Sequence, residues 1–138
     1  MIIGLSGKSG AGKDTVANFI QEQRLGGKTW DRYAFASPIK DACNLIFGWD
    51  HRHSFGHLKE VVDENFGISP RYAYQTLGTE WGRDIINRDI WLKVAEHHVH
   101  KNENTLITDL RFPNEVEWLR KVGGRILHVE RNTNSKSY

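Results

Sequence analysis

A glycine-rich segment near the start of the chain has the residue types needed to hold a phosphate. Gly7–Lys13 reads GKSGAGK, the glycine and lysine spacing of a phosphate-binding loop. Glycine permits the backbone angles that turn successive N–H groups around an anion, and Lys13 supplies a charge that can follow the β- and γ-phosphates of a nucleotide. A glycine-rich turn without a ligand is the plain alternative. We expect ATP to bind at Gly7, Lys8, Ser9, Gly10, Ala11, Gly12, Lys13, Asp14 and Thr15.

The residue after Lys13 departs from the usual pattern. A Ser or Thr hydroxyl normally stands there and binds Mg²⁺, whereas this chain has Asp14 followed by Thr15. Asp14 can hold Mg²⁺ through its carboxylate or through a water molecule, which leaves Thr15 for the α-phosphate; the alternative is a favourable acid in a first helical turn. Asp109 ends the apolar segment TLITD and is the second Mg²⁺ ligand that we expect, unless it caps the next segment.

Two cations stand where an acceptor phosphate could be held. Phosphoryl transfer gathers negative charge, so cations and in-line positioning matter more than a general base. Arg111 follows TLITD at the expected ligand-binding edge of a sheet, and surface pairing with Glu115 is its alternative. Lys40 lies in the first turn of an expected helix, where its charge opposes the helix dipole and invites an anion, although such a lysine can also be simply solvated.

A polar stripe lies on a further expected helix. Its members recur at a spacing of four, which places two guanidiniums, an amide and a hydroxyl on one face: Arg71, Gln75, Thr79 and Arg83. Such a face suits the phosphate, sugar and base of a nucleotide, and a solvated helix face has the same polarity. Arg88 is another phosphate candidate, and Trp91 can stack on a base or pack in the core.

These residues need an alternating α/β framework to position them. Apolar segments at 1–5, 30–35, 105–109 and 125–130 are expected strands. Helices are expected after the loop, with Val16, Phe19 and Ile20 on one face, and after Ser37-Pro38, Ser69-Pro70, Asp89 and Pro113. The helix after Ser69 carries an apolar stripe of Tyr74, Leu77, Trp81 and Ile85, and residues 48–57 have the composition of a loop. Strand, loop and helix in alternation indicate an α/β domain.

Composition limits the remaining classes of protein. The 138 residues suit one domain, contain one cysteine, Cys43, which we expect to be packed in the core, and carry a net charge of +2. The chain has no apolar run near the roughly 20 residues of a membrane helix and no basic stripe. We therefore expect no membrane, no nucleic acid polymer as a partner, and a reducing cytoplasm as the location. The residues leave open whether the chain forms a homodimer.

Four ordered segments resemble those of the bacteriophage deoxynucleoside monophosphate kinases, which are P-loop enzymes. They are GKSGAGKDT, then SPIKDA from Ser37, then QTLGTE from Gln75 with Arg83, Arg88 and Trp91, and finally DLRFPNE from Asp109. The first segment is shared with the related phosphomevalonate kinases, and the other three favour the phage enzymes. The resemblance extends from residue 2 to about residue 131.

The resemblance implies a three-layer P-loop fold with a parallel sheet of order 2-3-1-4 and helices on both faces. It implies a single domain, residues 1–138, with a monophosphate-binding helical part at about 37–102 inserted between strands 2 and 3. It also raises Lys40 and Asp41 to acceptor-site residues and places Arg131 where a lid segment leaves the sheet. We expect the family's lid and last strand to be absent.

The implied reaction is Mg²⁺-dependent transfer of the γ-phosphoryl group of ATP to a deoxynucleoside monophosphate, in the host cytoplasm if the chain is phage-encoded. Lys13, Arg111 and Arg131 are the implied catalytic residues. The alternatives are a kinase for another phosphorylated metabolite such as phosphomevalonate, a P-loop nucleotide-binding protein without turnover, and, least favoured, a DNA-binding module.

Overall fold

The computed structural model of the chain describes residues 1–8, 10–99 and 104–131. Two compact units make up this part of the chain. One unit combines Met1–Ala34 with the described residues from Ala95 onward and contains the sheet; the other is the intervening segment Phe35–Val94, which is helical. The assignment of residues 37–102 as a monophosphate-binding part stays a prediction, and its last three residues lie outside the described residues.

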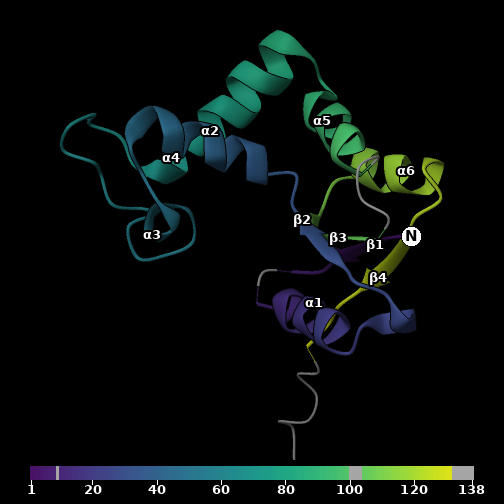
Figure 1. The fold of residues 1–138 in the computed structure, drawn as a ribbon. Helices are drawn as coiled ribbons and strands as arrows, with labels where there is room; N and C mark the ends of the chain where they lie inside the picture. Colours follow the sequence, from purple (N-terminus) through teal and green to yellow (C-terminus); the bar gives the residue numbers. More distant parts are fainter. Residues whose placement is uncertain (9, 100–103, 132–138) are drawn as a thin grey trace, which may run out of the picture. The chain divides into compact units, whose positions relative to one another are not determined.

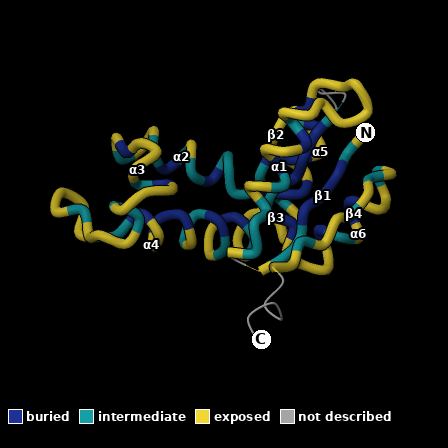
Figure 2. Tube along the Cα trace, turned by 90° about the horizontal axis from the view of Figure 1, so that it is seen from below, coloured by how far each residue is buried: buried dark blue, intermediate teal, exposed yellow. Residues whose placement is uncertain are grey.

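The sheet unit is built on four parallel strands in the order β2-β3-β1-β4, which confirms the predicted order 2-3-1-4 (Figure 1). The strands are β1 (Ile2–Ser6), β2 (Asp31–Tyr33), β3 (Thr105–Leu110) and β4 (Arg125–His128). The central strands β1 and β3 are buried along most of their length (Figure 2). Continuous apolar sequence is the usual mark of strands that are covered on both faces.

Helices cover both faces of this sheet. Alternate residues of a strand face opposite sides: Leu5 packs with Ala17 of α1, whereas Gly4 faces α6, where an added Cβ would lie 2.6 Å from Leu119 Cδ2. Figure 1 accordingly shows α1 and α6 on opposite sides of the strands. The bounds of the helices are Lys13–Glu22 for α1, Leu25–Gly27 for the short η1 and Pro113–Lys121 for α6.

Three details of the sheet unit differ from the sequence prediction. The strand expected at 30–35 pairs only over Asp31–Tyr33. Trp30 and Phe35 are buried in the core but lie outside the paired strand, so their apolar side chains reflect burial and not strand pairing. The strand expected at 125–130 ends at His128. Phe19 of α1 is 62% exposed, and Ala17 rather than Phe19 joins the core.

The helical unit has its own core. Its elements are α2 (Ser37–Phe47), α3 (His51–Ser54), α4 (Pro70–Gln75), the π-helix η2 (Thr76–Ile86) and the first half of α5 (Ile90–Val99). Six buried residues form the core cluster: Ile39, Cys43, Trp49, Ala73, Tyr74 and Trp91. Cys43 is packed as predicted, and burial raises the pKa of its thiol.

Capping explains where two of these helices begin. α4 begins at the predicted Ser-Pro pair, with the Ser69 hydroxyl accepting a hydrogen bond from the Tyr72 main-chain N–H at 3.2 Å. α2 begins one residue earlier than predicted, with Ala36 rather than Ser37 at the capping position and no side-chain cap. Pro38 still occupies the first turn, which tolerates its missing N–H.

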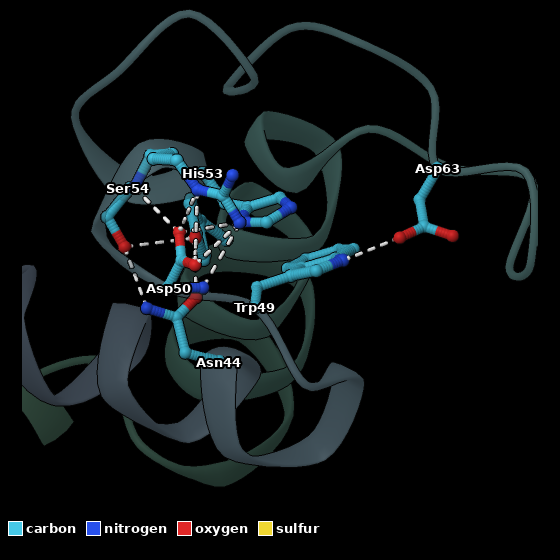
Figure 3. A network of polar contacts seen from close by, with 8 residues as sticks. Asn44, Trp49, Asp50, His53, Ser54 and Asp63 are labelled. Carbon is cyan, nitrogen blue, oxygen red and sulfur yellow. Dashed lines mark hydrogen bonds and ion pairs between the residues drawn. The ribbon is translucent and has the colours of Figure 1, made fainter.

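The predicted loop at 48–57 contains the short helix α3. Asp50 makes it possible, because its carboxylate accepts from the Arg52 main-chain N–H at 2.9 Å, and the His53 ring accepts in return from the Asp50 main-chain N–H at 3.1 Å (Figure 3). The Trp49 indole beside it donates to Asp63 at 2.8 Å. The polar composition of this segment reflects capping rather than irregular structure.

The apolar stripe predicted for the helix after Ser69 is buried only at its start. Tyr74 lies in the core, whereas Trp81 and Ile85 are 44% and 72% exposed. The reason is the change from α4 to the π-helix η2, whose i→i+5 turns rotate later residues away from an α-helical stripe. Of the helices in the described residues, none combines the length and apolar content needed to cross a bilayer.

Candidate active site

The carboxyl ends of the parallel strands meet at one edge of the sheet, which is where α/β proteins bind ligands. A glycine loop (residues 7–12) follows β1 at this edge, Arg111 follows β3, and Val129–Arg131 follow β4. The sheet thus gathers the predicted phosphate loop and two predicted catalytic arginines on one side. Ser9, a predicted ATP contact, lies outside the described residues.

The glycine loop has the backbone conformation that its sequence predicts. Gly7, Gly10 and Gly12 all have positive φ, at 149°, 80° and 100°. Gly7 is also held by space, because a Cβ there would lie 2.4 Å from the Val129 carbonyl oxygen. Gly12 then leads directly into α1, whose first residue is Lys13. The N–H groups at the start of α1 and the Lys13 ammonium therefore belong to one loop–helix junction, as an anion site requires.

A pocket of about 490 Å³ lies between this loop and the residues after β4. Its lining residues are Lys8, Gly10, Ala11, His128, Val129, Glu130 and Arg131. Two cations line the pocket, from the loop and from the predicted lid start. A hydrogen bond from the Val129 N–H to the Ser6 carbonyl, at 2.8 Å, joins the segment after β4 to the end of β1, from which the loop starts. The pocket has the position and charge to receive phosphates held by the loop.

Asp14 points away from the core and has an ionic partner. Its carboxylate lies 2.8 Å from Arg32 Nη2, and the same guanidinium donates to Asn18 at 2.7 Å. The Asp14 side chain is 86% exposed. Asp14 therefore serves as an acid in the first turn of α1, and its carboxylate is also accessible to a cation. Its role towards Mg²⁺ stays a prediction.

The end of β3 is shaped by a bulge and a buried carboxylate. β1 and β3 pair Gly4 with Ile107 and then Ser6 with Leu110, so β3 has one extra residue where Asp109 lies. Beyond the strand, buried Glu115 accepts from the main-chain N–H groups of Arg111 at 2.7 Å and Phe112 at 2.8 Å.

Glu115 thereby fixes the backbone at Arg111. The Arg111 guanidinium lies over the Phe112 ring, 5.5 Å from its centroid. The alternative for Arg111 was an ion pair with Glu115. Glu115 instead accepts from the Arg111 main-chain N–H, and the guanidinium makes a cation–π contact with Phe112.

The predicted acceptor residues of the helical unit have varied surroundings. The structure brings Thr79 and Arg83 together, with Arg83 Nη1 donating to Thr79 Oγ1 at 3.2 Å. Arg71 forms an exposed ion pair with Glu60 at 3.1 Å. Gln75 and Asp41 are exposed on their helices.

Lys40 and Arg88 also have neighbours. The Lys40 ammonium lies 4.2 Å from the centroid of the Phe55 ring, and Arg88 reaches Asp84 at 3.8 Å with its side chain 82% exposed. The Arg88–Asp84 contact is at the surface and costs little to exchange for an anion. Lys40 is half-buried. Trp91 is 7% exposed and donates its indole N–H to the Gly78 carbonyl at 2.8 Å. The structure therefore corrects the base-stacking interpretation of Trp91, whose ring belongs to the core.

Comparison with known proteins decides which family this architecture represents. A family model described as deoxynucleotide monophosphate kinase matches residues 49–138. A putative deoxynucleotide monophosphate kinase of Acanthamoeba polyphaga mimivirus is 31% identical over 147 residues, covering 95% of this chain and 74% of the relative. The chain belongs to the deoxynucleotide monophosphate kinase family. The deoxynucleoside-5'-monophosphate kinase of Escherichia phage T5 is 27% identical over 182 residues, covering 88% of this chain and 72% of the relative.

Some side chains at this edge of the sheet have donor atoms that suit Mg²⁺, the cation predicted from the sequence. Asp14 and Asp109 offer carboxylate oxygens, the hard ligands that Mg²⁺ prefers. No group of three His, Cys, Asp or Glu residues that could cage a metal occurs within the described ranges. Mg²⁺ usually keeps several waters and takes one or two carboxylates together with substrate phosphates, so the two carboxylates are a sufficient set.

Sequence reasoning missed three residues of this family member's site. Arg32 pairs with Asp14 from β2, a partner 18 residues away that no local pattern indicates. His128 and Glu130 line the pocket and contact each other at 3.2 Å, and the His128 ring also lies 3.1 Å from the Ser6 hydroxyl. Their signal was two polar residues at the carboxyl end of an expected strand, the edge where ligands bind.

Proposed function

We propose that this chain transfers the γ-phosphoryl group of ATP to a deoxynucleoside monophosphate, giving ADP and a deoxynucleoside diphosphate. The observation that carries the proposal is the junction of the glycine loop with α1. The glycine loop leads directly into Lys13 and the N-terminus of α1, and the same loop lines the pocket with Lys8, Gly10 and Ala11, at the carboxyl edge of a parallel sheet. The names of both relatives supply the acceptor class.

The chemistry proposed here is an in-line displacement. An oxygen of the acceptor phosphate forms a bond to the γ-phosphorus while the bond to the β–γ bridging oxygen breaks and ADP leaves. The acceptor phosphate is already ionised near neutral pH, so no strong general base is needed. Lys13, Arg111 and Arg131 neutralise charge on the phosphates and hold them in line. Mg²⁺, bound to the triphosphate and held by Asp14 and Asp109, would supply further neutralisation.

The helical unit supplies the proposed acceptor site. Arg83, steadied by Thr79, is the cation that we assign to the acceptor phosphate, and its guanidinium can bind two phosphate oxygens at once. The other proposed acceptor contacts are the half-buried Lys40 and four exposed polar side chains that can reorient towards a ligand: Asp41, Arg71, Gln75 and Arg88.

The cellular setting follows from the same reasoning. Both relatives are viral, so we propose that the chain works on free nucleotides in the cytoplasm of an infected cell. Its proposed partners are small molecules, and neither a nucleic acid polymer nor a membrane is required for the reaction.

A coupled assay of ADP release tests the function. The protein is given ATP and Mg²⁺ with each of the common deoxynucleoside monophosphates, and in parallel with phosphomevalonate. Turnover with at least one deoxynucleoside monophosphate and none with phosphomevalonate supports the proposal. Turnover with phosphomevalonate alone would move the chain to the related metabolite kinases. Tight ATP binding with no turnover on any acceptor would instead indicate a nucleotide-binding protein without catalysis.

A further inference from the structure

The helical unit contains a rare helix at the proposed acceptor residues. η2 is eleven residues of π-helix, whereas most π-helical turns are single bulges within α-helices, frequently at functional sites. The bond from the Asn87 N–H to the Gly82 carbonyl, at 2.9 Å, closes its last turn in the i→i+5 pattern. Because the chain would otherwise form an α-helix, the surroundings of η2 must favour the wider turns.

Trp91 of α5 provides such surroundings. Its indole Nε1 donates to the Gly78 carbonyl oxygen at 2.8 Å in a buried hydrogen bond. Its ring also lies against Gly82, where an added Cβ would be 2.7 Å from Trp91 Cζ2. On the other side, Ile39 Cδ1 lies 3.0 Å from the Cβ position of Gly78. A side chain at Gly82 would therefore clash with the indole, and one at Gly78 would be tightly confined; Trp91 contacts both glycines.

The two glycines immediately precede the two residues of the proposed phosphate contact, Thr79 and Arg83. Gly78 is followed by Thr79, and Gly82 is followed by Arg83. Whatever fixes the backbone at the glycines also fixes where the Thr79 hydroxyl and the Arg83 guanidinium emerge. These side chains meet at 3.2 Å, which shows that they leave η2 on the same face.

We propose that Trp91 is a positioning residue for acceptor binding. By holding Gly78 and Gly82, its indole keeps η2 in the π-helical form and aims the Thr79–Arg83 pair at the acceptor phosphate. The inference rests on the proposed function, in which Arg83 binds that phosphate. It replaces the stacking role first considered for Trp91 with an indirect one.

The test compares Trp91→Phe, which keeps an aromatic ring but loses the N–H donor, with Trp81→Phe, a matched change at an exposed position of η2. We expect Trp91→Phe to raise the KM and the Kd for the deoxynucleoside monophosphate about tenfold, as loss of about 1.4 kcal/mol would. The KM for ATP should stay unchanged, and amide exchange in residues 76–87 should become faster. Trp81→Phe should change none of these. If Trp91 mattered only for folding, Trp91→Phe would lower kcat, because less of the protein would be folded and active, and would leave both KM values unchanged. That result would overturn the inference.

Two further variants separate the possible failures. Gly82→Ala keeps the indole but forces it away, and should reproduce the effect of Trp91→Phe; it also carries the test should Trp91→Phe not fold. Arg83→Met should weaken acceptor binding directly. Weakening by Arg83→Met without any by Trp91→Phe or Gly82→Ala would overturn the inference and leave the proposed function standing. An unchanged Kd in Arg83→Met would overturn the acceptor role of Arg83 and the inference with it.

Discussion

Gly7 shows how closely one residue can tie the phosphate loop to the sheet. Its positive φ suits the loop, and its missing side chain leaves room for the Val129 carbonyl 2.4 Å from the Cβ position. Gly10 has a comparable left-handed backbone, but nothing lies within 4 Å of its Cβ position. A side chain at Gly10 would therefore meet backbone strain alone, whereas one at Gly7 would meet both backbone strain and a steric clash.

Replacing Gly7 by alanine should cost far more stability than replacing Gly10. Gly10→Ala should lower the free energy of unfolding by about 1 kcal/mol through left-handed strain alone. Gly7→Ala should lower it by about 3 kcal/mol, because the Val129 backbone must also move. Urea denaturation followed by circular dichroism measures both. Equal losses would show that the close approach to Val129 carries no cost.

The pair formed by Asp14 and Arg32 makes the proposed metal role testable. We expect Asp14→Asn to raise the Mg²⁺ concentration for half-maximal activity about tenfold, the lower end for losing a partner near a metal. Arg32→Gln should lower that concentration slightly or leave it unchanged, since an exposed ion pair contributes at most about 1 kcal/mol. A Mg²⁺ titration of the initial rate measures this. An unchanged requirement in Asp14→Asn would reduce Asp14 to an acid at the start of a helix.

At the scale of elements, local pattern determined what the sequence could predict. The first strand, the glycine loop and α1 were predicted together, because their signals lie next to one another in Ile2–Glu22. The π-helix η2 could not be predicted, because it depends on Trp91 packing against glycines nine and thirteen residues earlier. The site follows the same division: the loop was visible in sequence, whereas the pairing of Asp14 with Arg32 needed the fold.

Two carboxyls in and beside the helix α3 make the stability of the helical unit depend on pH. The pKa of the Asp50 carboxyl is held far below its ordinary 3.8, first by the Arg52 side chain and then by the Arg52 main-chain N–H. The Trp49 indole N–H is the main cause that lowers the pKa of Asp63. Both carboxyls bind protons more weakly in the folded chain than in the unfolded one. Their contribution to stability is therefore complete above the ordinary pKa of 3.8 and is lost as the pH falls below it.

Removing the Asp50 charge should flatten this acid dependence. Asp50→Asn should make the protein less stable at pH 6 and should reduce the further loss of stability between pH 4 and pH 2.5. Glu64→Gln, at an exposed position of the same unit, is the matched control and should keep the wild-type slope. Thermal unfolding at a series of pH values measures it. An Asp50→Asn variant with the full wild-type slope would show that other carboxyls control the acid transition.

At the scale of the whole molecule, the two units divide the proposed work. The sheet unit contains the glycine loop, Asp109, Arg131 and Arg111, the one proposed acceptor cation outside the helical unit, and the helical unit contains the other proposed acceptor residues. In this proposal the sequence signals for the donor and for most of the acceptor site fall in different parts of the chain. The donor side has a sharp motif, whereas the acceptor side depends on dispersed side chains of several helices.

Hydrogen exchange with one ligand at a time should reveal this division. ADP should slow amide exchange in residues 7–15 and around 128–131, at the glycine loop and the pocket beside it. A deoxynucleoside monophosphate alone should slow exchange in residues 70–86, within α4 and η2. The two patterns are each other's control. Protection of the glycine loop by the monophosphate, with none in α4 and η2, would contradict the assignment of the units.

The central claim is transfer of the γ-phosphoryl group with help from Lys13, and following the label itself tests it most directly. The protein is incubated with Mg²⁺, γ-labelled ATP and the preferred deoxynucleoside monophosphate, and the products are separated. We predict label in the deoxynucleoside diphosphate with the wild-type chain and at least about a hundredfold less with Lys13→Ala, whose folding is checked by circular dichroism. Label that appears only as inorganic phosphate, or equal transfer by folded Lys13→Ala, would contradict the account.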